Sequence, residues 1–272
     1  MPLRCGRFEL ERDRPLIMGI VNLTPDSFSG DGATDSAHAI THARRLVEEG
    51  ADLLDIGAES SRPGAIPVSE QEEIERLLPV LNALASCGVP LSVDTYKPEV
   101  MAAALAAGAD MINDITGFRD PQALSLVAAS ACGVCIMHMQ GVPLTMQQAP
   151  AYADVVAEVA DFLSQRLAAL EHAGVARERM VLDPGFGFGK TLEHNLALFR
   201  HLDRLAVAGR PVLVGVSRKS MLGALTGRPV EQRMPASVAA AVLAAERGAA
   251  IIRVHDVAAT KDALTIWHAL NH

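Results

Sequence analysis

Polar side chains able to bind or activate a small ligand occur at or just after the ends of eight short apolar runs. They are carboxylates, amides, a hydroxyl, cations and imidazoles: Asn22, Asp55, Asp94, Asn113, Asp114, His138, Asp183, Ser217, Arg218, Lys219, Arg253 and His255. Arg253 and His255 are two residues apart, so on a strand their side chains share one face. Two potential cations side by side suit a phosphate or pyrophosphate. The set predicts a binding site for a polar, partly anionic molecule.

Each of these residues also has a purely structural interpretation. Asp94, just before Thr95 and Pro98, is placed to cap the following helix. Asp183 precedes a proline, as a turn residue does, and Asn113 could satisfy local backbone groups. Packing roles account for one or two such residues but not for eight strand ends in register, so we interpret the set as a site.

The apolar runs are candidate strands, and amphipathic stretches of helical period lie between them. Strands are expected at 16–21, 52–56, 89–93, 110–112, 134–137, 180–182, 212–216 and 251–254. Helices are expected at 36–49, 69–84, 98–107, 121–131, 155–172, 192–205, 236–247 and 261–270. Eight strand–helix units without a long linker predict an α/β fold, a single (β/α)8 TIM barrel. In such a barrel the C-terminal ends of the strands form one face, where the polar residues would meet.

The length of 272 residues fits one barrel, since about 250 is typical. We expect residues 1–272 to form a single domain. Residues 1–14 would be a short N-terminal extension, forming a small hairpin that closes the N-terminal end of the barrel. The alternative fold is a doubly wound open sheet, but no Gly-x-Gly-x-x-Gly follows the first strand.

Composition limits the possible partners. The formal net charge is −8 and no basic run occurs, which disfavours nucleic acid and membrane surfaces as partners. The N-terminal residues lack the apolar core of a signal peptide, and no apolar run reaches the roughly 18 residues that a membrane span needs. We therefore expect a cytoplasmic protein that binds small molecules.

Two motifs suggest other kinds of chemistry, but their spacing or position does not support either interpretation. Residues 183–191, DPGFGFGKT, resemble a P-loop, but the position that requires its first glycine is Pro184. Cys132 and Cys135 form a CxxC within an apolar run that reads as a strand. Residues three apart on a strand point to opposite faces, so we expect buried free thiols rather than a metal or redox pair.

The loops at 22–32 and 57–64 are long, polar and rich in Gly and Pro, as binding loops often are.

Seven segments resemble the dihydropteroate synthase family, the folate-pathway enzymes that sulfonamides inhibit. They are GIVNLTPDSFS, ADLLDIGAESSRPGA, VPLSVDTYKPEV, GADMINDITG, VLDPGFGFGKT, VGVSRKSMLG and IIRVHDV, in register from Gly19 to Val257. The resemblance implies an enzyme that joins 6-hydroxymethyl-7,8-dihydropterin pyrophosphate to p-aminobenzoate and releases pyrophosphate. It also implies a homodimer.

The resemblance assigns roles residue by residue. The pterin would be held by Asp94, Asn113, Asp183, Lys219 and Arg253, and the pyrophosphate by Asn22, Arg253 and His255. Mg²⁺ would bridge the pyrophosphate oxygens with Asn22 as its protein ligand. The p-aminobenzoate side would consist of Ser61, Arg62, Pro63, Phe188 and Ser217. The residues expected to act in catalysis are Asn22, Lys219, Arg253 and His255, in a dissociative reaction through a pterin cation.

The chain departs from the family pattern at two positions, Ser61 where threonine is usual and Ala236 where glycine is frequent. Serine keeps the hydroxyl, and the alanine bears on local backbone and the subunit contact. Two other functions stay open at this point. One is a pterin-dependent methyltransferase on the same barrel, which would need neither the NLTPDSFS and SRPG loops nor the pyrophosphate cations. The other is a non-catalytic pterin-binding relative, against which the intact set of polar groups argues.

Overall fold

Eight parallel strands form the central sheet of the computed structural model, which describes residues 2–23, 32–60 and 64–271. The strands are β3 (Leu16–Asn22), β4 (Leu53–Gly57), β5 (Leu91–Asp94), β6 (Met111–Asp114), β7 (Gly133–Met137), β8 (Met180–Asp183), β9 (Leu213–Val214) and β10 (Ile251–Val254). They pair in the order β8-β7-β6-β5-β4-β3-β10-β9. A bridge between Leu182 and Val212 joins the two ends and closes the barrel. The predicted (β/α)8 barrel is confirmed.

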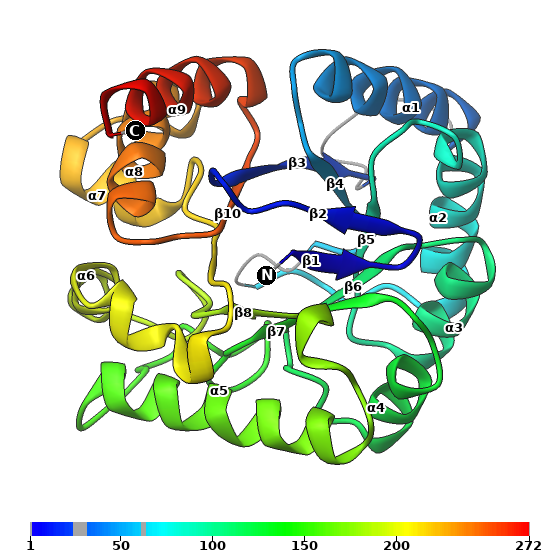
Figure 1. Cartoon of the computed structure of the whole chain (residues 1–272), viewed down its shortest axis with the longest axis horizontal. Helices are drawn as coiled ribbons and strands as arrows, with labels where there is room; N and C mark the ends of the chain where they lie inside the picture. Colours follow the sequence, from blue (N-terminus) through cyan, green and yellow to red (C-terminus); the bar gives the residue numbers. More distant parts are fainter. Residues whose placement is uncertain (1, 24–31, 61–63, 272) are drawn as a thin grey trace.

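The helices form a ring around the strands (Figure 1). They are α1 (Gly32–Glu48), α2 (Glu70–Leu84), α3 (Pro98–Ala106), α4 (Pro121–Ala128), α5 (Val155–His172), α6 (Leu192–Arg200), α7 (Ser220–Thr226), α8 (Met234–Glu246) and α9 (Val257–Asn271). Ser69 caps α2, because its side chain accepts from the N–H of Glu72 at 3.2 Å. Among the helices that the structure describes, none is long and apolar enough to cross a membrane.

Three expectations about the elements were wrong in detail. The helix expected at 192–205 ends at Arg200, and a separate 3-10 turn, η3 (Leu202–Leu205), follows a non-helical His201 with ψ 36°. Helix α7 was not predicted, because seven residues are too few to show a helical period. The strand expected at 212–216 is regular only over Leu213–Val214, and the residues after it turn toward the site described below.

The first residues form the expected hairpin, in which β1 (Leu3–Cys5) pairs antiparallel with β2 (Phe8–Leu10). Leu3 and Cys5 are buried in one cluster with side chains from seven barrel strands, including Met18 and Met111. Gly133 makes room for this hairpin, because a Cβ there would lie 2.9 Å from the Cys5 sulfur. The hairpin therefore closes one end of the barrel, as Figure 1 shows with β1 and β2 crossing in front of the strands.

The four cysteines are free thiols. Cys132 packs in the large cluster between the sheet and the helices, whereas Cys135 packs in the inner cluster with the hairpin. The expectation that the two point to opposite faces is confirmed. Within the described ranges, no group of three or more His, Cys, Asp or Glu side chains is placed to hold a metal ion.

Candidate active site

The C-terminal ends of neighbouring strands bring the predicted polar residues together. Parallel pairing sets Asp94 of β5 opposite Gly57 of β4 and Asn113 of β6, and it sets Asp183 of β8 opposite Met137 of β7. The alternation of side chains along each strand then aims every second residue into the barrel. These side chains therefore converge on one end of the barrel, opposite the N-terminal hairpin.

Arg253 of β10 lies between two of the carboxylates. Its Nε donates to Oδ2 of Asp55 at 2.6 Å, and its Nη2 donates to Oδ2 of Asp94 at 3.1 Å. The Asp55 side chain is fully buried, and its other oxygen accepts from the hydroxyl of Ser92 at 2.6 Å. Both ion pairs use only part of the guanidinium, so its Nη1 donors lie outside them. The arrangement fixes the plane of the guanidinium at the mouth of the barrel.

In the side-chain amide of Asn113, the nitrogen is hydrogen-bonded and the oxygen is not. Its Nδ2 donates to Oδ2 of Asp55 at 3.1 Å, and this contact fixes the orientation of the amide. Its Oδ1 is buried and has no hydrogen-bond partner among the described residues. A buried acceptor without a partner is costly in a folded protein. An N–H donor on a ligand would satisfy it.

Burial shifts the pKa values of the ionisable groups here. Burial, and next the charge of Asp55, raises the pKa of Asp94 to about 7, against the opposing effect of Arg253. Burial also raises the pKa of Asp183, while Lys219 opposes that shift. Burial lowers the pKa of Lys219 to about 8 even though Asp183 favours its charged form. Several ionisable groups whose pKa values are shifted toward neutral pH, close together in space, are typical of functional sites.

The loop between β8 and α6 closes tightly over this end of the barrel. Asp183 Oδ1 accepts from the N–H of Gly185 at 2.7 Å. Lys219 donates to the C=O of Phe186 at 2.5 Å and lies 4.7 Å from the centroid of the Phe188 ring. Gly185 has φ +68°, and a Cβ on it would collide with the carbonyl oxygen of His138. Glycine is thus required where the loop backbone meets the β7 loop.

Lys190 is a buried lysine that sequence reasoning missed, although it ends the same glycine-rich segment. Its ammonium donates to the carbonyl oxygens of Gly185 and Phe188 at 2.9 and 3.0 Å, and it lies 2.9 Å from Nδ1 of His138. Burial lowers the pKa of Lys190 to about 7, and burial together with the Lys190 charge lowers the pKa of His138 to about 2. His138 is therefore neutral and supports the loop, rather than serving as a strand-end side chain that is open to a ligand.

Ser217 and His255 form the part of the site nearest β9 and β10. The Ser217 hydroxyl accepts from the N–H of His255 at 3.2 Å and shares a hydrogen bond of 3.0 Å with its Nδ1. Asn22 ends β3 and pairs with Gly57 of β4, so it lies on the same rim of the barrel. Ser61, Arg62 and Pro63, assigned to the p-aminobenzoate side, lie outside the described residues.

Some strand-end residues have structural roles. Asp114 accepts from the N–H groups of Thr116 and Phe118, both at 2.7 Å, so it stabilises the loop after β6. Asp94 is not the cap of the following helix, because α3 has Lys97 at its N-cap and Asp94 pairs with Arg253. Asp55 was placed at a strand end without a role, and it proves to be the common partner of Ser92, Asn113 and Arg253.

Lys97 belongs to a second buried ion cluster that sequence reasoning missed. Its ammonium lies 2.6 Å from Glu59 and 2.8 Å from Glu73, and the hydroxyl of Tyr96 donates to Glu59 at 2.8 Å. Glu59 also accepts from the N–H of Val68 at 2.9 Å. The cluster therefore joins the two ends of the loop after β4 to β5 and α2.

Comparison with known proteins gives this site its context. Residues 18–255 match the family model described as pterin binding enzyme. The chain belongs to the pterin-binding enzyme family. The chain is 54% identical to the dihydropteroate synthase of Neisseria meningitidis serogroup B, covering 98% of this chain and 96% of the relative. The predicted resemblance to the dihydropteroate synthases is confirmed.

Solved structures of pterin-binding enzymes agree with the fold. The dihydropteroate synthase of Burkholderia cenocepacia, complexed with 7,8-dihydropteroate, superimposes with a TM-score of 0.91 at 55% identity, covering 99% of this chain and 96% of that one. The Xanthomonas albilineans enzyme with 4-aminobenzoic acid gives 0.92 at 54% identity, covering 99% and 98%. These ligands are bound by the relatives, so the individual residue roles expected from the sequence stay predictions.

Proposed function

We propose that the chain is a dihydropteroate synthase, which condenses 6-hydroxymethyl-7,8-dihydropterin pyrophosphate with p-aminobenzoate to form 7,8-dihydropteroate and pyrophosphate in folate biosynthesis. The observation that carries the proposal is the buried Oδ1 of Asn113, unpartnered among the described residues and set beside Asp94 and Arg253. A flat heterocycle with N–H donors on its edge matches this arrangement. The relatives with dihydropteroate and 4-aminobenzoic acid bound support the same substrates.

The pterin would bind across the ends of β5, β6 and β8. Its aminopyrimidinone edge offers adjacent N–H donors, which the Asp183 carboxylate can accept in pairs while it keeps its bond to Gly185. Asn113 Oδ1 and Asp94 would accept further N–H groups. Lys219 would donate to ring acceptors. The Arg253 guanidinium would stack on the ring, since its plane is fixed by two carboxylates.

The pyrophosphate would lie toward β3 and β10, against Asn22, Arg253 and His255. A bound Mg²⁺ would fit here with Asn22 as its protein ligand, because Mg²⁺ takes few protein oxygens and keeps substrate phosphates and water. Such an ion would neutralise charge on the leaving group. The p-aminobenzoate would bind beside Phe188 and Ser217, with the segment Ser61, Arg62 and Pro63 completing its side.

The reaction would proceed by cleavage of the C–O bond before the amine attacks. The strand-end groups that the structure describes at the mouth are acids, amides, imidazoles, cations and the hydroxyl of Ser217. Ser217 is assigned to the p-aminobenzoate side, so we assign no covalent nucleophile among them. The dihydropterin can delocalise positive charge from its exocyclic carbon, whereas the amine of p-aminobenzoate is a weak nucleophile. Arg253 and His255 would stabilise the departing pyrophosphate. The loops at 22–32 and 57–64 are expected from the sequence to exclude water, but residues 24–31 and 61–63 of these loops lie outside the described residues.

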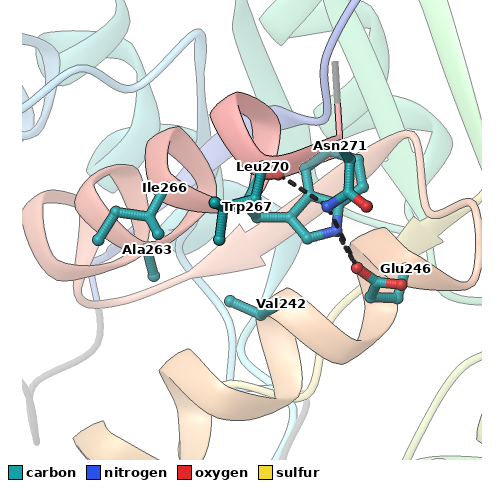
Figure 2. A pocket seen from close by; sticks show the side chains of 7 residues that line it. All are labelled: Val242, Glu246, Ala263, Ile266, Trp267, Leu270 and Asn271. Carbon is teal, nitrogen blue, oxygen red and sulfur yellow. Dashed lines mark hydrogen bonds between the residues drawn. The ribbon is translucent and has the colours of Figure 1, made fainter.

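A homodimer is the assembly that we propose. Apolar side chains are exposed on neighbouring helices, including Leu243 of α8 and Ile266 and Leu270 of α9, the last two being 63% and 80% exposed. Figure 2 shows Ile266, Trp267 and Leu270 of α9 and Val242 of α8, which line one hollow between the two helices. The volume of this hollow is about 380 Å³. Contiguous exposed apolar surface of this kind favours a protein contact, and a second copy is the partner implied by the family.

The direct test is to incubate the protein with the pterin pyrophosphate, p-aminobenzoate and Mg²⁺ and to measure dihydropteroate by mass spectrometry. Asp183→Asn is the matched variant, because an amide oxygen can keep the bond to Gly185 but cannot accept two ring N–H groups. Product from the wild type, with little from a folded Asp183→Asn variant, supports the proposal. Methyl transfer from a methylated folate with no dihydropteroate formed would instead support the methyltransferase alternative.

A further inference from the structure

A tight turn after β9 carries Ser217 and Lys219 on either side of Arg218. The N–H of Lys219 donates to the C=O of Val216 at 3.1 Å, which makes residues 216–219 a β-turn. Arg218 is the third residue of this turn and has φ +57°, a conformation in which glycine is favoured. A residue with a side chain persists there only when its surroundings hold it.

The backbone of Arg218 is held on both sides by the start of α8. Its N–H donates to the hydroxyl of Ser237 at 2.9 Å, and its C=O accepts from Nη1 of Arg233 at 3.1 Å. Ser237 is buried and donates in turn to the C=O of Arg233 at 2.8 Å. Both polar backbone groups of the strained residue therefore have a partner on a neighbouring element.

The side chain of Arg218 reaches the start of α9. Its Nε donates to Oδ2 of Asp256 at 3.0 Å and its Nη2 to Oδ1, which makes a two-pronged ion pair. Asp256 directly follows His255, and its C=O accepts from the N–H and hydroxyl of Thr260 in the first turn of α9. The ion pair thus connects the turn bearing Ser217 to the residue next to His255.

Gly223 of α7 leaves the space that Arg233 occupies. A Cβ at Gly223 would overlap the guanidinium of Arg233, which also donates from Nε to the C=O of Arg228 at 3.0 Å. The lack of a side chain at Gly223 is therefore part of what lets Arg233 reach the Arg218 carbonyl.

We infer that the Arg218–Asp256 ion pair, with Ser237 and Arg233, is a clasp that fixes the 216–219 turn in its left-handed form. The clasp sets the positions of Ser217, Lys219 and His255 for the reaction, so Arg218 and Asp256 are positioning residues. The ligands assigned to these three residues rest on the proposed function. The geometry of the clasp does not.

The first test compares Arg218→Ala with Arg218→Gly. Both variants remove the ion pair, but only glycine adopts a positive φ without steric cost. We expect Arg218→Ala to raise KM for p-aminobenzoate about tenfold and Arg218→Gly only about threefold, because the alanine Cβ disfavours the turn. Binding of a free pterin should change less in both, because Lys219 is the one assigned pterin ligand in the turn, whereas Asp94, Asn113, Asp183 and Arg253 lie outside it. Equal effects of the two substitutions would overturn the role of the turn.

The second test needs no activity. Asp256→Asn should speed amide hydrogen exchange at Arg218 and Lys219 about tenfold, because local opening becomes easier when the clasp is weakened. Asp52→Asn is the matched control. Its ion pair with Arg14 is also two-pronged, and the side chains are 34% and 17% exposed, against 37% and 18% for Arg218 and Asp256. Unchanged exchange in Asp256→Asn, or the same increase in the control, would overturn the clasp.

A third variant, Gly223→Ala, leaves the ion pair untouched and displaces only Arg233. Alanine is the better helix former, so an effect confined to α7 would be neutral or stabilising. The clasp predicts instead a higher KM for p-aminobenzoate and faster exchange at the Arg218 amide. If the wild type forms no dihydropteroate, the proposed function fails, and the exchange measurements still decide the clasp.

Discussion

Arg253 on β10 and Asp55 on β4 form an ion pair of 2.6 Å, with the Asp55 side chain fully buried and that of Arg253 18% exposed. Removing one partner of a buried pair leaves the other charge poorly compensated, and only Asp94 would then remain paired with Arg253. We expect Asp55→Ala to lower the free energy of unfolding by about 3 kcal/mol. We also expect weaker pyrophosphate binding, because Asp94 alone would no longer fix the guanidinium plane. Urea denaturation and calorimetry with pyrophosphate would measure both effects.

The control is Glu49→Gln, which removes an exposed pair with Arg45 at the end of α1. Exposed pairs contribute little to stability, so this variant should unfold at nearly the wild-type urea concentration. A loss in Asp55→Ala no larger than in the control would show that the buried pair does not organise the site.

The pH dependence of kcat/KM should be bell-shaped, with limbs near pH 7 and pH 8. On the proposed assignments, we expect the free enzyme to bind the pterin pyrophosphate best when Asp94 is ionised and Lys219 is protonated. The pKa of Asp94 is raised to about 7 and that of Lys219 is lowered to about 8, and kcat/KM reports groups of the free enzyme. Activity should therefore rise as pH increases through 7 and fall as it passes 8.

The variant Lys219→Arg tests whether Lys219 causes the fall in activity above pH 8, because a guanidinium stays protonated throughout this range. The variant should lose the fall above pH 8 even if its maximal rate is lower. The assignment to Lys219 is wrong if the alkaline limb of Lys219→Arg coincides with that of the wild type.

Sequence patterns predicted the barrel and its mouth because both depend on local signals. Each strand is a short apolar run, and each run ends in a polar residue such as Asp94 or Asp183. Patterns could not show which of these residues contact each other. Asp55 and Arg253 are 198 positions apart, and only the pairing of the last strand, β10, with the first barrel strand, β3, brings Arg253 close to β4.

Lys190 and Lys97 were missed for a different physical reason. A lysine is ordinarily exposed, and nothing in the sequence shows that carbonyl oxygens or carboxylates will surround it after folding. Alternating glycines at 185–189 were a partial signal, since they indicate close backbone approach, and Lys190 fills the space beneath that loop. The sequence pattern included Arg218 only as one of the polar residues at strand ends. It gave no sign of the role in the turn, because the positive φ is found only in the folded chain.

Lys190 should make stability depend on pH. Its pKa is about 7 in the folded chain, against 10.5 as the ordinary value, so between these values the unfolded chain binds one more proton. The free energy of unfolding therefore rises with pH, by about 1.4 kcal/mol per unit between pH 7 and 10 from this group. The difference between the wild type and Lys190→Met should follow that slope and become flat below pH 7.

Lys261→Met is the control, because Lys261 lies partly exposed on α9. Its stability relative to the wild type should stay constant over the same range. A constant difference for Lys190→Met would mean that Lys190 titrates near its ordinary value in the folded chain.

The order of bond cleavage is the last prediction. If the C–O bond breaks before the amine attacks, the bridging oxygen of the pterin pyrophosphate can exchange with non-bridging positions while p-aminobenzoate is absent. We expect an oxygen label placed at the bridge to scramble in enzyme-bound substrate, as followed by NMR. We also expect a normal secondary deuterium isotope effect at the exocyclic carbon, since that carbon becomes trigonal in a cationic transition state.

The two measurements are needed together because Arg253 and His255 could hold the departing pyrophosphate too firmly to rotate, which would hide scrambling. The isotope effect does not depend on rotation and reports bonding at the carbon itself, provided that chemistry limits the rate. His255→Ala should loosen the pyrophosphate, so scrambling should become faster relative to net turnover in that variant. No scrambling in either protein, together with an isotope effect near unity, would mean that the amine displaces pyrophosphate directly and that the cations stabilise a single concerted step.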